Sequence, residues 1–255
     1  YDIYIGENIV KNAFDLFEKD FEVACVITDD NVDRLYFGLV EKIIKDKNKK
    51  VIKYAFTPGD KSKSIETMAG ILEFMAENKM DRGDIVIALG GGVCGDIAGL
   101  CASLYLRGVA FIQIPTTLLA QVDSSVGGKC AVNLNAGKNL CGAFYQPDMV
   151  VCDVSFLNTL SEDEFKNGMA EVIKYGALFD EELFKNCVNP KSKLKDIIQR
   201  CIELKKEVVE EDEKDTGRRQ LLNFGHTLGH AIEKYSDFKI SHGKAVGIGM
   251  AVMQR

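Results

Sequence analysis

The first part of this chain alternates between two hydrophobic patterns, one typical of strands and one typical of helices. This alternation constrains its fold more strongly than any other feature of the sequence. Up to about residue 153, apolar runs of strand length are separated by stretches in which apolar residues recur at helical spacing. This alternation predicts an α/β sheet. The predicted strands are "VACVIT" (23–28), "DIVIAL" (84–89), "VAFIQIP" (109–115) and "MVVCDV" (149–154), and the predicted helices cover 31–47 and 64–80.

The strand signals stop after residue 155. Ser161 stands three positions before Glu164, which is a helix-capping pattern, and residues 193–213 place their apolar side chains on one helical face. We therefore expect an α/β domain over 1–155 and a mostly α-helical domain over 156–255. The final stretch, 245–255, is helical in pattern without a stop signal, so we expect the natural chain to continue.

Composition narrows the class of protein. Of the 255 residues 46% are hydrophobic, no apolar run is long enough to span a membrane, and the eight cysteines form no CxxC pair. We expect a cytoplasmic protein whose cysteines are mostly small buried hydrophobes. The net charge of −6 argues against nucleic-acid and membrane partners, although it allows a local basic pocket for a small anion.

A glycine-rich stretch follows the second of these strands. Gly90, Gly92 and Gly95 have the G-x-G-x-x-G spacing that lets backbone N–H groups approach a pyrophosphate at a helix start. The alternative is a tight turn with no ligand. An earlier strand ends at Asp29 and Asp30, where a carboxylate could accept hydrogen bonds from ribose hydroxyls or could simply cap a helix.

All three histidines, His226, His230 and His242, fall within seventeen consecutive positions. The first two share a helical face, as in helical metal sites, but position 227 is threonine and not the glutamate of an H-E-x-x-H protease. The alternative is a set of histidines that hydrogen-bond in a core or on a surface.

A carboxylate ligand for such a metal is predicted at Glu171. This residue lies in an apolar helical stretch beside Lys174, where an unpaired glutamate would be costly to bury. Catalytic zinc commonly takes three histidine or carboxylate ligands. The alternative is an ordinary Glu171–Lys174 ion pair.

Several basic residues stand singly among glycines or apolar residues, unlike the solvated run "KDKNKK". Together they predict convergence on a bound anion. They are Arg107, Lys129, Lys138, Lys174, Lys205, Arg218 and Arg219.

Taken together, these motifs resemble the 3-dehydroquinate synthase family. The stretches "LGGGVCGDIAG", "FIQIPTTLLAQVDSSVGGKCAVN", "GKNLCGAFYQP", "LSEDEFKNGMAEVIKYG" and "LLNFGHTLGHAIE" with "HGKAVGIGM" occur in that family's order and spacing. The resemblance implies a Rossmann-like N-terminal domain, a helical C-terminal domain and an active site in the cleft between them. It also implies an NAD- and zinc-dependent lyase of the shikimate pathway, in which Co²⁺ can replace zinc.

The resemblance carries site residues over one by one. The implied metal ligands are Glu171, His226 and His242. The implied cofactor residues are Asp29, Asp60, Lys63, Gly91, Gly92, Asp96, Thr116, Thr117, Asp123 and Lys138. The implied substrate residues are Arg107, Lys129, Lys138, Asn139, Lys205, Arg219 and Asn223. Catalytic roles are implied for His230, Asn223, Lys174, Asp123 and Lys129. The arginine that Arg107 matches reaches the neighbouring subunit's site, which implies a homodimer.

The implied substrate is the anionic sugar-phosphate acid 3-deoxy-D-arabino-heptulosonate 7-phosphate. Transient oxidation by NAD, loss of phosphate, re-reduction and an intramolecular aldol closure would give 3-dehydroquinate. Two departures stand out: Asp60 replaces the family's usual glutamate, and the family continues for roughly a hundred residues more, including a late lysine at the phosphate.

Three alternatives stay open at this stage. A 2-deoxy-scyllo-inosose synthase shares the chemistry but not the substrate carboxylate, and Lys205 and Arg219 favour an acid substrate. A metal-dependent polyol dehydrogenase typically uses aspartate where this chain has Glu171, and it would accumulate NADH. A catalytically silent NAD- or metal-binding module would bind zinc without turnover.

Overall fold

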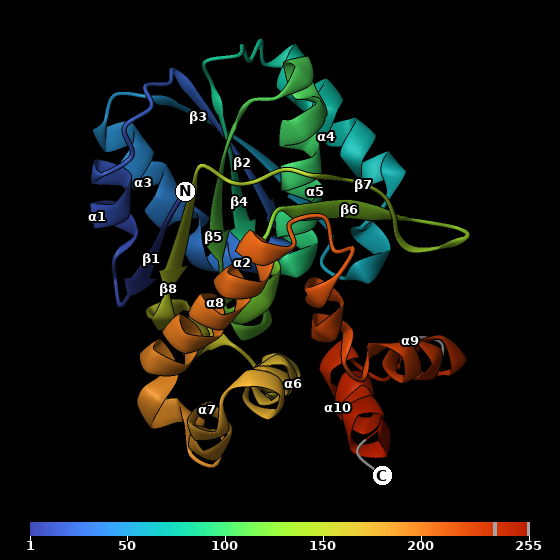
Figure 1. Cartoon of the computed structure of the whole chain (residues 1–255). Helices are drawn as coiled ribbons and strands as arrows, with labels where there is room; N and C mark the ends of the chain where they lie inside the picture. Colours follow the sequence, from blue (N-terminus) through green and yellow to red (C-terminus); the bar gives the residue numbers. More distant parts are fainter. Residues whose placement is uncertain (237–238, 254–255) are drawn as a thin grey trace. The chain divides into compact units, whose positions relative to one another are not determined.

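The four apolar runs predicted as strands all form strands of one parallel sheet (Figure 1). Two further strands complete it, and the order across the sheet is β1-β8-β5-β4-β2-β3. The strands are β1 (Asp2–Gly6), β2 (Val23–Asp29), β3 (Lys50–Phe56), β4 (Ile85–Gly90), β5 (Ala110–Pro115) and β8 (Met149–Asp153). Because every pair is parallel, both faces need a helical cover.

The structure is a computed structural model that describes residues 1–236 and 239–253. These residues fold into two units. Unit 1 comprises Tyr1–Thr116 and Gly128–Ser155, and unit 2 comprises Thr117–Gly127 and Phe156–Arg255. The sequence predicted a single division at residue 155, whereas the segment Thr117–Gly127 joins the helical unit. The reason is local: its π-helical turn η4 (Ala120–Ser124) packs against helices of unit 2.

Helices cover the sheet of unit 1, with α1 and α3 on one side and α4 and α5 on the other (Figure 1). The elements are α1 (Val10–Asp15), α2 (Asp30–Val32), the π turn η1 (Asp33–Phe37), α3 (Gly38–Asp46), η2 (Asp60–Ser62), α4 (Ile65–Glu77), α5 (Gly92–Leu104) and η3 (Tyr105–Arg107). The predicted helix over 31–47 is thus interrupted by a π turn. Apolar side chains between the sheet and α4 and α5 form one core, for example Cys25, Ile27, Ile71, Met75, Ile97 and Phe111.

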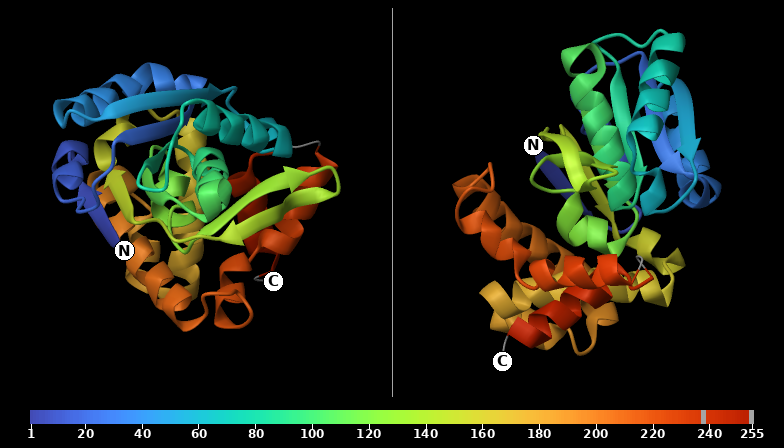
Figure 2. Two further views of the ribbon diagram at one scale, coloured as in Figure 1. Left: turned by 90° about the horizontal axis from the view of Figure 1, so that it is seen from above. Right: turned by 90° about the vertical axis from the view of Figure 1, so that its right-hand side faces the viewer.

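A two-stranded antiparallel hairpin, β6 (Lys129–Leu134) and β7 (Gly137–Phe144), stands apart from the main sheet. It lies alongside α5, as Figure 2 shows. Cys130 and Val132 turn into the same core as α5, while Leu140 and Phe144 of the hairpin are exposed. Asn139 of the hairpin contacts Lys63, which also pairs with Asp96 of α5.

Unit 2 is helical, as predicted. It contains η4, α6 (Glu162–Phe179), α7 (Glu181–Asn186), η6 (Pro190–Lys193), α8 (Leu194–Glu211), η7 (Arg218–Asn223), α9 (His226–Tyr235) and α10 (His242–Met253), and η5 (Val154–Thr159) leads into it. Ser161 caps α6 by accepting a hydrogen bond from the Glu164 N–H, which confirms the predicted cap. The apolar face predicted for α8 is buried.

Two further predictions concern the whole chain. Six of the eight free cysteines are buried and two are partly exposed, as expected for small core residues. No helix among the described residues combines the length and the apolar character needed to cross a bilayer. Residues 254 and 255, the end of the predicted terminal helix, lie outside the described residues.

Candidate active site

Two of the three histidines begin helices that cross at very short range. His226 is the first residue of α9 and His242 is the first residue of α10. Gly225 has φ +78°, a left-handed conformation that glycine adopts without strain, and a Cβ on Gly249 would lie 2.1 Å from the Gly225 carbonyl oxygen. Only a hydrogen atom fits at Gly249, so the two helices approach backbone to backbone there, and a close approach of Gly229 to the Val246 backbone continues this contact toward the start of α10. The two imidazole centroids are 5.1 Å apart.

Glu171 of α6 completes this group. Its side chain is 1% exposed, and its Oε1 lies 3.6 Å from His226 Nε2 and 3.8 Å from His242 Nε2. Lys174 pairs with the other carboxylate oxygen, Oε2, whereas Oε1 is buried without a hydrogen-bond partner among the described residues. Ligand atoms about 2.0–2.1 Å from a tetrahedral zinc ion would be roughly 3.3–3.4 Å apart. A buried, unbonded carboxylate oxygen close to two imidazole nitrogens therefore fits a divalent metal.

The outer nitrogens of these histidines are directed at acceptors. His226 Nδ1 is 3.2 Å from the Phe224 carbonyl oxygen, and His242 Nδ1 is 3.4 Å from Glu233 Oε2. Donation from Nδ1 leaves the Nε2 lone pair toward Glu171 in both rings. Burial lowers the pKa of His226, although Glu171 opposes this, so the ring favours the neutral form that a metal requires.

His230 is not part of this ligand set. Its Nδ1 lies 2.7 Å from Glu233 Oε2, three residues further along α9, and its side chain is 53% exposed. His230, Glu233 and His242 also lie close enough together to form a second group of possible metal-ligand type. Sequence reasoning missed Glu233. The signal was present, because Glu233 follows His230 at i+3 and therefore lies on the same helical face.

A second buried network surrounds Asp123 in η4. The carboxylate accepts hydrogen bonds from the Tyr175 hydroxyl (2.6 Å) and pairs with the Lys205 ammonium (2.8 Å). Lys205 also donates to the Asp123 carbonyl. Burial alone would raise the pKa of Asp123, but Lys205 and Lys174 outweigh it and hold that pKa well below its usual range. The carboxylate is therefore ionised throughout the physiological range.

The pKa values of Lys174 and Lys205 shift in opposite directions. Burial would lower the pKa of Lys174, but Glu171 and Asp123 outweigh it and raise the pKa. For Lys205 burial prevails over Asp123 and lowers the pKa. Tyr175, which the sequence analysis did not single out, has its pKa raised by burial and by Asp123, so it stays a hydrogen-bond donor. Its position next to Lys174 was the only sequence signal for it.

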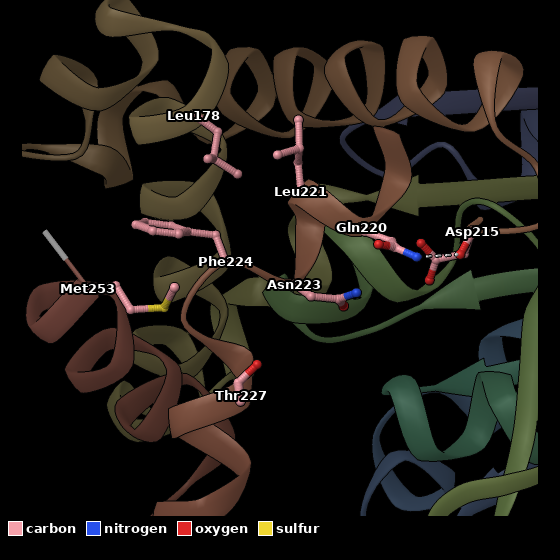
Figure 3. Close-up of a pocket in the computed structure, with 8 residues that line it drawn as sticks. All are labelled: Leu178, Asp215, Gln220, Leu221, Asn223, Phe224, Thr227 and Met253. Atoms are coloured by element: carbon pink, nitrogen blue, oxygen red, sulfur yellow. Dashed lines mark hydrogen bonds between the residues drawn. The ribbon is translucent and has the colours of Figure 1, made fainter. Parts of the chain in front are cut away.

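Arg219 and Asn223 come from η7. Arg219 is 2% exposed, and its guanidinium donates to the carbonyl oxygens of Gly127 (2.9 Å) and Glu213 (2.6 Å). Asn223 lines an open pocket of about 450 Å³ at the end of η7 (Figure 3). The other lining residues are Leu178, Asp215, Gln220, Leu221, Phe224, Thr227 and Met253. Arg218, by contrast, is paired with Glu211 near the surface.

Four of the predicted nucleotide residues, Asp29, Gly91, Gly92 and Thr116, lie at the carboxyl ends of strands in unit 1, whereas Thr117 and Asp123 belong to unit 2. The chain passes from β2 to β3 on one side and then returns to β4 on the other side of β2, so the strand order reverses between β2 and β4. Open α/β sheets bind ligands outside such a switch point. Here Asp29 ends β2, Gly91 caps α5 and Gly92 begins it, and the Thr116 N–H donates to the Gly90 carbonyl.

Asp29 has a structural role as well. Its Oδ1 accepts hydrogen bonds from the N–H groups of Asn31 and Val32, so it caps α2. The other oxygen, Oδ2, faces the glycine turn, since a Cβ on Gly90 would lie 3.9 Å from it. Of the two neighbouring carboxylates that could cap a helix, Asp29 and Asp30, it is Asp29 that does so.

Five more of the predicted residues in unit 1 belong to one polar network: Asp60, Lys63, Asp96, Lys138 and Asn139. Lys63, which is 7% exposed, pairs with Asp96 of α5 and lies 2.5 Å from Asn139 Oδ1. Lys138 lies 3.3 Å from Asp60, whose carboxylate also accepts from Asn133 at 3.2 Å. The hairpin, η2 and α5 are tied together by these contacts. Asp60, one methylene shorter than the family's glutamate, is therefore held by the hairpin.

Three predicted residues lie outside both networks. Arg107 is exposed, has φ +70°, and forms no hydrogen bond or ion pair within the described part of the chain. Lys129 is exposed at the start of β6. Thr117 begins the segment that belongs to unit 2, where its Oγ1 accepts from the Ala120 N–H.

Comparisons with known proteins identify the family of this chain. The family model of the 3-dehydroquinate synthase N-terminal region matches residues 53–167, and that of the C-terminal region matches residues 168–255. The 3-dehydroquinate synthase of Clostridium acetobutylicum is 48% identical over 259 residues, which cover 98% of this chain and 73% of that protein. The synthase of Clostridium beijerinckii is 50% identical, with 98% and 74% covered.

Solved structures show the same fold. A 2-deoxy-scyllo-inosose synthase complexed with carbaglucose-6-phosphate, NAD⁺ and Co²⁺ has a TM-score of 0.89 at 31% identity, covering 98% of this chain and 72% of that one. A 2-epi-5-epi-valiolone synthase from Streptomyces hygroscopicus with NAD⁺ and Zn²⁺ bound has a TM-score of 0.87 at 27% identity, with 99% and 73% covered. An iron-containing alcohol dehydrogenase, at 15% identity and a TM-score of 0.73, shares the fold alone. Since both halves match the family models and the Clostridium enzymes are nearly half identical, the chain belongs to the 3-dehydroquinate synthase family.

Proposed function

We propose that this chain converts 3-deoxy-D-arabino-heptulosonate 7-phosphate to 3-dehydroquinate and phosphate, with NAD and a zinc ion that Co²⁺ can replace. Family membership supports the reaction, and solved relatives of the same fold carry NAD⁺ with Co²⁺ or Zn²⁺. The observation that carries the proposal is the position of Glu171 Oε1, which is buried close to the Nε2 atoms of His226 and His242 and has no hydrogen-bond partner among the described residues.

Glu171, His226 and His242 would hold the metal. When bound there, zinc would supply a Lewis acid that polarises a substrate hydroxyl. The chain itself contributes by holding the metal ligands in position before the metal binds. Lys174 holds the Glu171 carboxylate through Oε2, so that Oε1 stays directed at the two histidines. Its raised pKa keeps Lys174 cationic in this role.

The cofactor residues proposed for NAD are those at the switch point of unit 1 and in its polar network. NAD would supply a reversible hydride acceptor. The N-terminus of α5 at Gly91 and Gly92 presents N–H groups to a pyrophosphate, and Asp29 Oδ2 faces the same turn as a ribose acceptor. Lys63, fixed by Asp96, adds a cation nearby.

A substrate with a carboxylate and a phosphate needs cations that are held in place. Lys205 and Arg219 meet this need in unit 2, because each is almost fully buried and anchored through carbonyl oxygens. In unit 1 the proposed contacts are Arg107, Lys129, Lys138 and Asn139. Anchored cations stabilise developing phosphate charge without reorganising during the reaction.

We assign proton transfer to Nε2 of His230. Its Nδ1 is held by Glu233, which leaves Nε2 as the exchanging atom on a side chain that is half exposed. Asn223, which lines the open pocket, is proposed to position a water molecule or a substrate hydroxyl. Asp123, ionised and fixed by Tyr175 and Lys205, is proposed to orient groups near the nicotinamide.

The test is phosphate release from 3-deoxy-D-arabino-heptulosonate 7-phosphate with zinc and sub-stoichiometric NAD, while NADH absorbance is followed in the same cuvette. We expect many turnovers of phosphate without lasting NADH. Accumulating NADH would indicate a dehydrogenase instead. Glucose 6-phosphate, which lacks the carboxylate, serves as the comparison substrate. Faster turnover of glucose 6-phosphate than of 3-deoxy-D-arabino-heptulosonate 7-phosphate would favour a 2-deoxy-scyllo-inosose synthase.

Two further expectations remain predictions. We propose a homodimer, because the arginine that Arg107 matches in the family serves the neighbouring subunit, and light scattering on the purified chain would measure its mass. The cytoplasmic location expected from the sequence also remains a prediction.

A further inference from the structure

Glu233 occupies a position that is unfavourable for a carboxylate in two ways. It is 3% exposed, and it lies in the last turn of α9, where the helix dipole disfavours negative charge. Burying a charged carboxylate is costly unless hydrogen bonds compensate. Two histidines contribute to this compensation, because Oε2 faces His230 Nδ1 at 2.7 Å and His242 Nδ1 at 3.4 Å.

The two metal-site histidines differ in what holds them. His226 Nδ1 faces a backbone carbonyl, that of Phe224, which is fixed by the fold. His242 Nδ1 faces a side chain, the Glu233 carboxylate, which alone among these acceptors carries a charge. A carboxylate behind a ligand imidazole fixes the tautomer and the ring orientation and makes the ligand more basic.

We propose that Glu233 is a positioning residue that holds His242 with Nδ1 protonated and Nε2 directed at the metal, and that it holds His230 through the same oxygen. This inference rests on the proposed function, because it requires a metal at Glu171, His226 and His242. Glu233 would touch neither metal nor substrate. It would link the ligand histidine to the proton-transferring histidine through one carboxylate.

A different use of the same atoms would be a second metal ion held by His230, Glu233 and His242. The two uses exclude each other, because Nδ1 of His242 cannot donate a hydrogen bond and coordinate a metal at once. The metal content of the wild-type chain separates them. One zinc ion per chain agrees with a positioning role, and two ions bound tightly would overturn it.

The experiment compares Glu233→Gln and Glu233→Ala with Asp163→Asn as matched control. Asp163 is 79% exposed and pairs with Lys244 at 3.1 Å, so the control removes a carboxylate beside the first turn of α10 without touching a histidine. Three quantities are measured on the full chain: zinc affinity by competition with a chromophoric chelator, the visible spectrum of the Co²⁺ form, and the thermal stability of the metal-free form.

We expect zinc affinity to fall by about 10–100-fold in Glu233→Ala, by less in Glu233→Gln, and not at all in Asp163→Asn. The Co²⁺ spectrum should change in both Glu233 variants. Unchanged affinity and an unchanged spectrum would overturn the proposal. So would a loss of metal-free stability with zinc affinity intact, since Glu233 would then be a purely structural residue. If the wild type itself binds no zinc, the proposed function fails instead.

Discussion

Two glycines on one helix provide a sharp test of how the metal site is assembled. In α10, a Cβ on Gly249 would lie 2.1 Å from the Gly225 carbonyl oxygen, whereas a Cβ on Gly247 would meet no atom within 4 Å. Both substitutions to alanine gain the same helix propensity, about 1 kcal/mol. The difference between the two variants therefore isolates the contact between α9 and α10.

The expected difference in stability between the two variants follows from that contact. Relief of the overlap at Gly249 requires the helices to separate, and overpacking of this kind costs about 1–3 kcal/mol. Gly247→Ala should be stabilised by about 0.5–1 kcal/mol relative to the wild type. The two variants should then differ by about 1–3 kcal/mol, or roughly 2–12 °C in melting temperature for a chain of this size. Far-ultraviolet circular dichroism of the metal-free proteins measures this difference.

The same pair tests the link to the metal. Since the crossing places His226 beside His242, separation of the helices in Gly249→Ala should weaken zinc binding, whereas Gly247→Ala should bind zinc like the wild type. Equal stability and equal zinc affinity in the two variants would refute the close helix crossing and, with it, the explanation of how the ligands are brought together.

Further predictions concern the metal, the acid response and the thiols. His226→Ala should lose zinc while His230→Ala keeps it, as measured by metal analysis after gel filtration. Equal zinc loss in both variants would contradict the assignment of His226 as a metal ligand and His230 as a proton carrier. Because the pKa of Asp123 is lower in the folded chain than in the unfolded chain, its stabilising contribution is complete above about pH 4 and is lost as pH falls further. The stability gap between wild type and Asp123→Asn should accordingly narrow below that pH in acid-dependent urea titrations. Only Cys141 and Cys187 are partly exposed, so a thiol reagent should label two thiols quickly in the native chain and the other six only on unfolding; fast labelling of more than two would contradict the buried core.

The sequence predicted the inner strands of the sheet but not its edges. The four predicted strands are mostly apolar and almost entirely buried, since helices cover them on both faces. The two that were missed, β1 and β3, are the edge strands of the observed order, and most of their residues are partly or fully exposed. Lys50 and Lys53 interrupt the apolar pattern of β3, so no continuous apolar run marks it. The half-exposed hairpin strands β6 and β7 escaped prediction for the same reason.

The sequence predicted which residues belong to the candidate site but not how those residues are arranged in space. Histidine spacing suggested a metal, and the family resemblance supplied the ligand set, because both depend only on residue type and order. The role of Tyr175 depends on its contact with Asp123, which lies 52 positions earlier in the chain, and the role of Glu233 depends on a side-chain contact between the neighbouring helices α9 and α10. Likewise, the membership of Asp123 in the helical unit follows from packing of η4 against α8, which no local pattern records.

The pairing of β1 with β8 has a consequence for how the chain acquires its sheet during synthesis. In the part of the chain that the structure describes, β1 pairs with one strand, Met149–Asp153, and the Asn8 N–H donates to Asp153 across 145 positions of sequence. Closing a loop of that length costs roughly 4 kcal/mol of chain entropy. A ribosome-bound chain therefore has β2, β3, β4 and β5 available for pairing long before β1 has a partner. We expect β1 to join last, after β8 has left the ribosome, which makes it the strand most open to capture by chaperones in the nascent protein.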